Sequence, residues 1–219
     1  MKRYFITGTD TDCGKTYVTC MLLAYLNQKY KAQAIKPIAS GCEEVKGQLV
    51  SQDVVRLQAY NADENTSINY WKYKEPIAPH LAAHLVNEEV TATQVMQFCE
   101  QTKFNYFDYL LIEGAGGLLV PLNNHETWLD FLKLFNIPVI LVVGMRLGCI
   151  NHALLTDALL KAHQVPCLGW IANDVSKEML FREENISTLK AMMHMPFIGR
   201  VYYDALNHFN IEFDNNLLI

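Results

Sequence analysis

Residues 8–16 read Gly8-Thr9-Asp10-Thr11-Asp12-Cys13-Gly14-Lys15-Thr16, and this stretch decides how the rest of the chain is interpreted. A short apolar run, residues 3–7, precedes it, and residues 16–26, with apolar side chains at helical spacing, follow it. A strand, a glycine-containing loop and a helix in this order are the context of a phosphate-binding loop. In such a loop the backbone N–H groups and the helix dipole face an anion. Lys15 would then reach the β- and γ-phosphates, and the Thr16 hydroxyl would bind Mg²⁺.

The spacing of this loop departs from the common pattern. Five residues separate Gly8 from Gly14 where the pattern has four, and Thr9 stands at the strict glycine position. A chance Gly-Lys-Thr in a surface loop is the alternative interpretation. The strand before the loop and the helix after it favour a site for a nucleoside triphosphate.

Composition limits the kind of protein. With 219 residues, of which 51% are hydrophobic, the chain is predicted to form one domain, residues 1–219, with a sizeable core. The net charge of −5 is spread without long single-sign runs, so neither a nucleic acid nor a membrane surface is expected as a partner. The longest apolar stretch, residues 137–145, is too short to cross a bilayer. The N-terminus does not read as a signal peptide, and a soluble cytoplasmic protein is predicted.

The cysteines and histidines give no metal pattern. Six cysteines occur without a Cys-x-x-Cys pair, which indicates free thiols in a reducing compartment. His80 and His84 have a zinc-compatible spacing on an expected helix, but neither a third ligand nor a His-Glu-x-x-His pattern accompanies them.

Strand and helix patterns alternate along the chain with short connections. Helices are expected at 15–29, from 51, at 78–86, 91–102, 151–163 and 177–193, and strands at 3–7, 33–35, 66–73, 109–112, 138–143, 169–172 and 197–201. This alternation predicts an α/β fold, a doubly wound and mostly parallel sheet with helices on both faces, as in P-loop NTPases. The tail, residues 207–219, shows no clear period.

Several polar residues follow predicted strands and would meet at one edge of the sheet. Lys36 ends one strand, and an ordinary solvated lysine is the alternative for it. Glu113 ends a buried strand and is placed like an acid that holds Mg²⁺. Asp53 lies in the first turn of a helix that Ser51 can cap, and the helix dipole alone would explain its carboxylate. The sequence therefore predicts one site at this edge.

Five stretches of the sequence, spread nearly from end to end of the chain, together resemble the dethiobiotin synthetase family. The resemblance is carried by residues 4–12 with 14–16, by Lys36-Pro37-Ile38-Ala39-Ser40-Gly41, by Glu113-Gly114-Ala115-Gly116-Gly117, by Gly148-Cys149-Ile150-Asn151-His152-Ala153 and by Trp170-Ile171-Ala172-Asn173-Asp174. The five-residue spacing of the loop is this family's own form.

The resemblance implies a reaction. One amine of 7,8-diaminononanoate captures CO₂ as a carbamate, and the γ-phosphate of Mg·ATP passes to that carbamate. The second amine then attacks the carbamic–phosphoric anhydride, which closes the ring of dethiobiotin and releases phosphate. Joining two anions requires positive charge, and phosphoryl transfer requires positioning more than a protein nucleophile.

The resemblance also implies residue roles. The catalytic residues would be Thr11, Lys15 and Lys36, and the Mg²⁺ ligands Thr16, Asp53 and Glu113. ATP would be held by Asp12, Cys13, Gly14, Lys15, Thr16, Tyr17, Asp53, Glu113, Gly114, Ala115, Gly116, Asn173, Asp174, Tyr202, Tyr203 and Asp204, with Asn173 reading the adenine. The diamine would be held by Thr11, Lys36 and Ser40, and its carboxylate by Gly148, Cys149, Ile150 and Asn151. In the family this last segment comes from the neighbouring subunit, so a homodimer is implied.

Two positions depart from the family. Cys13 stands where relatives carry an apolar residue such as valine, and residues 201–204 lack the proline that usually precedes an aromatic residue near the nucleoside. Three other functions remain open. A switch ATPase of the ParA or MinD kind would carry an extra lysine in the loop, and residues 8–13 contain none. A cobyrinate-type amidating ligase would need a glutaminase domain, for which the chain has no room. The third is a nucleotide-binding paralogue without turnover.

Overall fold

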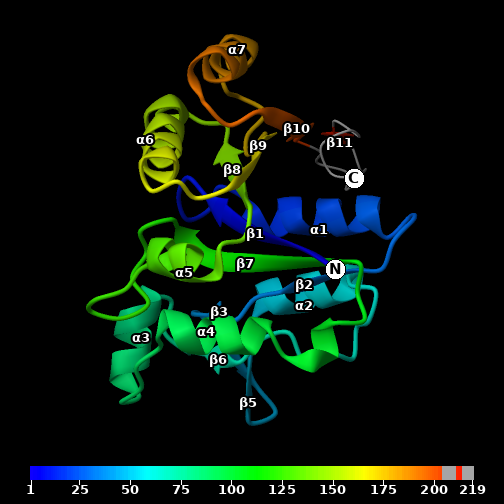
Figure 1. Cartoon of the computed structure of the whole chain (residues 1–219), viewed down its shortest axis with the longest axis vertical. Helices are drawn as coiled ribbons and strands as arrows, with labels where there is room; N and C mark the ends of the chain where they lie inside the picture. The colour runs from blue at the N-terminus through cyan, green and yellow to red at the C-terminus, as the bar shows by residue number, and fades with distance from the viewer. Residues whose placement is uncertain (204–210, 214–219) are drawn as a thin grey trace.

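A seven-stranded sheet organises the computed structural model, which describes residues 1–203 and 211–213. The strand order is β11-β10-β9-β8-β1-β7-β2, and every neighbouring pair is parallel except β10 and β11 (Figure 1). The strands are β1 (Lys2–Gly8), β2 (Ala32–Ile35), β7 (Tyr109–Gly117), β8 (Val139–Gly144), β9 (Cys167–Asn173), β10 (Phe197–Val201) and β11 (Ile211–Phe213). The predicted α/β class with a mostly parallel sheet is confirmed.

Eight helical segments connect the strands. They are α1 (Lys15–Leu26), α2 (Gln52–Tyr60), α3 (Pro79–Leu85), α4 (Ala92–Cys99), the 3₁₀ turn η1 (Thr102–Phe104), α5 (Trp128–Phe135), α6 (Cys149–Ala162) and α7 (Arg182–Met192), counted over the described ranges. The chain steps from β1 to β2 in one direction along the sheet and from β7 through β8 and β9 to β10 in the other. Because parallel crossovers are right-handed, α1 covers one face and α5, α6 and α7 cover the other.

Two small sheets lie outside the main one. β3 (Ile38–Ala39) pairs with β6 (Trp71–Lys72) in parallel, and β4 (Glu43–Val45) pairs with β5 (Gln48–Val50) in an antiparallel hairpin. The hairpin projects from the lower end of the molecule in Figure 1. The sequence predicted neither of these two pairings. Of the four strands, only β6 falls within a predicted one, at 66–73.

Four predicted elements need correction. Residues 66–73 form a strand only at Trp71–Lys72, because the Asn69 amide donates to the carbonyl oxygens of Lys36, Pro37 and Trp71 and bends the segment. The helix expected at 177–193 begins at Arg182, after Phe181 in the left-handed region with φ 51°. Ser51 stands at the N-cap of α2 but makes no side-chain cap hydrogen bond. The helix expected at 91–102 ends at Cys99, and a separate turn follows.

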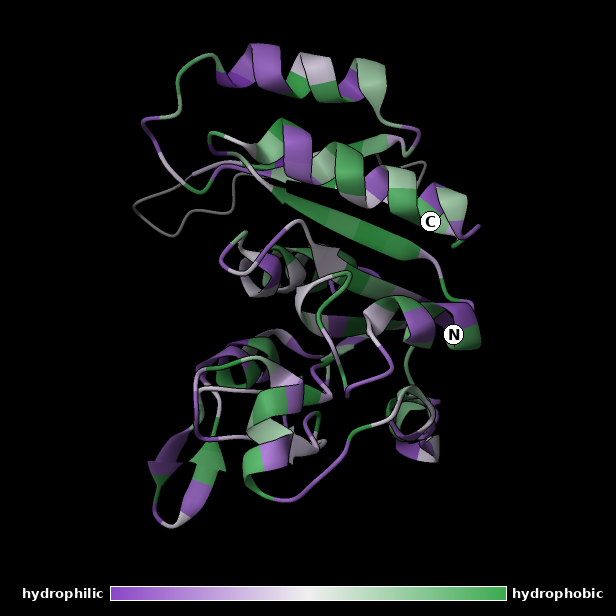
Figure 2. Cartoon of the chain, turned by 90° about the vertical axis from the view of Figure 1, so that its left-hand side faces the viewer, coloured by the Kyte–Doolittle hydropathy of each residue, from purple (hydrophilic) through white to green (hydrophobic). Residues whose placement is uncertain are grey.

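The centre of the sheet is a continuous apolar core. Residues 4–8 of β1, the first six residues of β7 and all of β8 are buried, as expected of strands covered on both faces. The Phe5 ring packs against Trp128 and Phe131 of α5, with centroids 5.2 and 5.5 Å away. Gly114 is required here, since a Cβ at that position would lie 2.6 Å from the Phe5 ring. Figure 2 shows the strand in its centre as hydrophobic along its length, between helices that carry hydrophilic residues as well.

The outer edge of β2 is covered by hydrogen bonds from the segment that follows α2. The Asn61 amide donates to the Ala34 carbonyl (3.0 Å) and accepts from the Ala34 N–H (2.6 Å). The Ala62 N–H donates to the Ala32 carbonyl (3.1 Å). The segment after α2 therefore occupies the hydrogen-bonding positions of a further strand.

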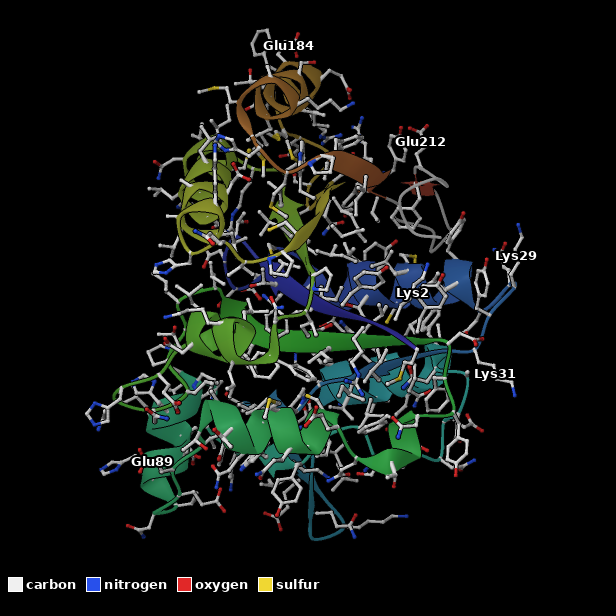
Figure 3. The ribbon with its side chains drawn as sticks, in the orientation of Figure 1. Lys2, Lys29, Lys31, Glu89, Glu184 and Glu212 are labelled. Atoms are coloured by element: carbon white, nitrogen blue, oxygen red, sulfur yellow. The ribbon has the colours of Figure 1, made fainter. Side chains whose placement is uncertain are left out.

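Charged residues of both signs lie on the surface of many elements. In Figure 3 the labelled side chains of Lys29 and Lys31 extend away from the ribbon. Among the helices of the described ranges, none has the length and apolar character needed to cross a membrane.

Candidate active site

A cavity of about 650 Å³ opens at the carboxyl edge of the central strands. Eleven of the residues singled out from the sequence line it: Thr11, Asp12, Gly14, Lys15, Thr16, Tyr17, Lys36, Ser40, Asp53, Ala115 and Gly116. These residues come from four separate stretches of the chain. The structure therefore places these eleven residues together at one edge of the sheet, as the sequence predicted.

The phosphate-binding loop wraps into the N-terminus of α1. Gly14 is the N-cap residue, with φ 85°, and a Cβ there would lie 2.0 Å from the Asn173 amide nitrogen, so only glycine fits. The Lys15 ammonium donates to the Asp10 carbonyl oxygen (3.0 Å). No side chain caps the first N–H groups of α1, which leaves them directed at the cavity for an anion.

Four buried or half-buried polar residues form what we call the carboxylate cluster: Thr16, Lys36, Asp53 and Glu113. Glu113 Oε1 accepts from the Thr16 hydroxyl (2.6 Å) and from the Lys36 ammonium (2.7 Å). The Lys36 ammonium also lies 2.8 Å from Asp53 Oδ2. Strand register explains the contact, because Ile35 pairs with Ile112 and places Lys36 beside Glu113 at the end of adjacent strands.

The cluster shifts the titration of its members. Burial alone would lower the pKa of Lys36, but the charges of Glu113 and Asp53 and their hydrogen bonds outweigh it and raise the pKa above its ordinary value. Burial alone would raise the pKa of Asp53. The Lys36 charge, hydrogen bonds from Lys36 and Thr16, and the charge of Arg56 outweigh burial and lower that pKa. Lys36 and Asp53 therefore both stay ionised at neutral pH.

The cluster also fits a divalent cation. Glu113 is fully buried, and its Oε2 atom has no hydrogen-bond partner, an arrangement that is costly unless a cation or donor meets it. The hydroxyl of Thr16 and the carboxylates of Asp53 and Glu113 are hard oxygen donors of the kind Mg²⁺ prefers. Among the described residues, this cluster included, no group of three His, Cys, Asp or Glu side chains could hold a metal ion by itself. A nucleotide-linked Mg²⁺ needs only one or two protein carboxylates, because phosphates and water complete its shell.

A second group of ion pairs, which we call the arginine cluster, lies at the ends of β9 and β10 and consists of Asp174, Arg182, Glu183 and Arg200. Asp174 Oδ2 accepts from Arg200 Nη2 (2.9 Å) and Nε (3.2 Å) and from Arg182 Nη1 (3.3 Å). Arg200 Nη1 donates to Glu183 (2.7 Å), and its guanidinium lies over the Tyr202 ring at 4.4 Å.

The residues expected around the nucleoside lie near this second cluster. Asn173 Nδ2 donates to the Cys13 carbonyl (2.9 Å), which ties β9 to the phosphate loop. Asp174 is buried against the arginines rather than in the cavity, and Tyr203 is 44% exposed. Asp204 lies outside the described residues, so its predicted role and those of its neighbours stay predictions.

Some predicted residues do not line the cavity of this single chain. Cys13 is buried beneath the loop, where its sulfur lies 2.2 Å from the position of a Cβ on Gly8. Residues 148–151 begin α6, and the next residues of that helix line a second, mostly apolar hollow of about 580 Å³ together with residues 9–11 and 117–121. The carboxylate-binding role of residues 148–151 stays a prediction.

The cavity contains residues that the sequence did not single out. They are Arg56, residues 76–79 and Val120. Arg56 follows Asp53 by three positions on α2, so the helical spacing would have placed it on the same face. Arg146, in the loop before α6, also forms an unpredicted ion pair with Asp10 of the phosphate loop (2.5 Å).

The fold and the site define a P-loop nucleotide-binding protein of the α/β class. A family model described as an AAA domain matches residues 2–207. The chain is 51% identical over 203 residues to the ATP-dependent dethiobiotin synthetase BioD of Legionella pneumophila (strain Corby), covering 93% of this chain and 94% of that protein. It is 44% identical to the enzyme of the same name from Pseudoalteromonas translucida, over 91% of this chain and 89% of that protein. The chain belongs to the dethiobiotin synthetase family.

A solved structure shares the fold at much lower identity. The septum site-determining protein MinD of Pyrococcus horikoshii, in complex with Mg-ADP, superposes with a TM-score of 0.58 at 16% identity, covering 93% of this chain and 82% of that one. At this identity the likeness concerns the fold alone.

Proposed function

We propose that the chain uses Mg·ATP to convert 7,8-diaminononanoate and CO₂ into dethiobiotin, the ring-closing step before biotin. The observation that carries the proposal is the carboxylate cluster beside the phosphate loop, in which Lys36 joins Asp53 and Glu113 at the cavity wall. A buried lysine held there supplies the positive charge needed where a carbamate meets a terminal phosphate. The family relationship supports ATP-dependent ligase activity.

The proposed reaction has three steps. An amine nitrogen of the substrate attacks CO₂, a C–N bond forms, and the nitrogen loses a proton to give the carbamate. A carbamate oxygen then attacks the γ-phosphorus, and the bond from that phosphorus to the ADP oxygen breaks. The second amine attacks the carbamoyl carbon, inorganic phosphate leaves, and the five-membered ring closes with loss of a proton.

In this proposal the residues of the cavity position reactants rather than form covalent bonds. The backbone N–H groups of the loop and Lys15 hold the phosphates, and Lys36 with Thr11 and Ser40 orients the carbamate. Thr16, Asp53 and Glu113 would hold Mg²⁺, which neutralises charge on the phosphate oxygens. Lys36 would then exchange part of its contact with the carboxylates for the carbamate.

We further propose that the enzyme works as a homodimer in the cytoplasm. Leu147, just before α6, is fully exposed, and Leu155 of α6 and Leu119 are 63% and 55% exposed. Leu155 and Leu119 line the same apolar hollow. Apolar side chains gathered in this way favour contact with a second copy, and the start of α6 would then reach the partner's cavity. We expect a Leu147→Glu variant to sediment as a monomer and to lose diamine turnover.

The test of the function is a coupled measurement on the purified protein. ADP release with Mg·ATP and bicarbonate would be followed with and without diaminononanoate, and the product identified by mass. Diamine-dependent release with about one dethiobiotin per ADP is expected from the single phosphoryl transfer. ATP hydrolysis that ignores the diamine would contradict the proposal and favour a switch ATPase. Bound nucleotide without any hydrolysis would identify a paralogue that has lost turnover.

A further inference from the structure

Arg56 is a cation of the main cavity that has no part in the steps above. It lies on α2, three residues after Asp53, and lines the same cavity as Lys15 and Lys36. Residues three apart share one face of a helix, so α2 presents Asp53 and Arg56 to the cavity together. Arg56 therefore belongs to the wall that carries the proposed metal ligands.

The other two cations of the cavity are already engaged. The Lys36 ammonium is held between Glu113 and Asp53 at 2.7 and 2.8 Å, and Lys15 donates to the Asp10 carbonyl. In contrast, no hydrogen bond or ion pair joins the Arg56 guanidinium to another residue of the described ranges. Its donors are thus available to a ligand.

The charge of the site shows what that ligand would be. The two lysines are balanced by the carboxylates of Asp53 and Glu113, so these four residues supply no net charge. A nucleoside triphosphate keeps an excess of negative charge even with Mg²⁺ bound, and a carbamate adds to it. Positive charge close to the point where the two anions meet lowers the energy of their approach. Arg56 is placed to supply it.

We propose that Arg56 binds the terminal phosphoryl group of the nucleotide, the group that passes to the carbamate. Its guanidinium is a planar fork of N–H donors that matches the geometry of phosphate oxygens. It stands beside Asp53, whereas Asn173 and the arginine cluster lie on the other side of the phosphate loop. The contact therefore concerns the γ-phosphate and not the nucleoside. The identity of the acceptor rests on the proposed function, but the phosphate contact does not.

The experiment compares two nucleotides in the absence of the diamine. Calorimetric titration with Mg²⁺ would use ADP and a non-hydrolysable ATP analogue on the wild type, Arg56→Ala, Arg56→Lys and Lys161→Ala. The last variant removes the same charge from an exposed position in the last turn of α6. We expect Arg56→Ala to weaken binding of the analogue about tenfold and of ADP less than about twofold, as for one lost charge-assisted contact. Arg56→Lys should fall between, and Lys161→Ala should match the wild type.

Three outcomes would overturn the proposal. Arg56→Ala could weaken both nucleotides equally, which would indicate a general charge effect, or it could weaken neither. A third result would come from steady-state turnover of the same variants with the diamine, where an increase in the KM for the diamine alone would assign Arg56 to the other substrate. Because Arg56 is exposed and holds no described residue, the variant should keep the melting temperature of the wild type. A wild type that binds both nucleotides yet makes no dethiobiotin would contradict the proposed function and leave the Arg56 result intact.

Discussion

The carboxylate cluster and the arginine cluster are two networks of buried charged residues on opposite sides of the phosphate loop. They differ in their net formal charge. Each contains a buried carboxylate with one oxygen that has no partner, Glu113 in the first and Asp174 in the second. An unpartnered carboxylate oxygen therefore does not by itself distinguish a binding site from a structural network of ion pairs.

Formal charge and access distinguish the two clusters. The carboxylate cluster sets one lysine against two carboxylates beside a cavity, so it carries a surplus of negative charge that suits a divalent cation. The arginine cluster sets Arg182 and Arg200 against Asp174 and Glu183 and is neutral by itself. The formal charge of the first cluster therefore leaves room for a cation, whereas the charges of the second balance within the chain.

The largest effect should come from Lys36→Met in the carboxylate cluster. In the proposed reaction the Lys36 ammonium supplies the charge that meets the carbamate, so its removal should lower turnover by about 10²–10³-fold, as for loss of a preorganised electrostatic group. ADP affinity should stay within about threefold, since the loop N–H groups and Lys15 hold the phosphates. Steady-state ADP release and calorimetric binding of ADP measure the two quantities.

Lys161→Met provides the control for the loss of one positive charge, and its turnover should equal that of the wild type. Turnover that survives in Lys36→Met would remove Lys36 from the reaction. A comparable loss of ADP binding would show that the lysine serves the nucleotide instead, and the contrast between the clusters would have to be redrawn.

A smaller and different effect is expected from Arg200→Met in the arginine cluster. The change leaves the buried Asp174 carboxylate with only Arg182, so the free energy of unfolding should fall by about 3 kcal/mol, as when one partner of a buried pair is removed. Turnover at saturating ATP should change little, because none of these four residues lines the cavity. Urea unfolding and steady-state kinetics on the same preparation measure both.

Arg200→Lys keeps the charge but loses the fork of donors, and it should recover part of the lost stability. If Arg200→Met instead kept its stability and lost turnover as fully as Lys36→Met, the arginine cluster would be part of the active site.

The smallest effect concerns how α2 brings Asp53 to the carboxylate cluster. Ser51 makes no cap hydrogen bond there, whereas Thr127 accepts one at the start of α5. Ser51→Ala should therefore cost less than about 0.5 kcal/mol of unfolding free energy and Thr127→Ala about 1 kcal/mol. Chemical denaturation of the two variants measures the difference. A larger loss in Ser51→Ala would mean that the serine, rather than the contact of Asp53 with Lys36, holds the start of α2.

The sequence predicted the fold because its strands are apolar runs bounded by clear turns, and parallel order follows from their alternation with helices. It also selected most of the residues that line the cavity. It did not show that Lys36 lies between Asp53 and Glu113, because that contact depends on the pairing of β2 with β7 and on the position of α2.

Other features were missed for identifiable reasons. The helix α5 begins with a Thr127–Asp130 capping box, a local sequence pattern that is typical of a helix start. The bend at Asn69 arises from hydrogen bonds to residues about thirty positions away, which no local pattern contains. In the sequence Arg56 is typical of a solvated helical arginine, because only the folded chain places it beside the cavity.

The pairing of the Asn61 amide with Ala34 has a consequence for the behaviour of the protein at high concentration. An open edge strand offers unpaired N–H and C=O groups on which another molecule can add a strand, and such addition leads to aggregation. At β2 the Asn61 side chain occupies both groups of Ala34, and the Ala62 N–H and the Asn27 side chain occupy those of Ala32. Leucine at position 61 would free the N–H and C=O of Ala34 at this edge, so we expect an Asn61→Leu variant to self-associate more readily than the wild type at high concentration.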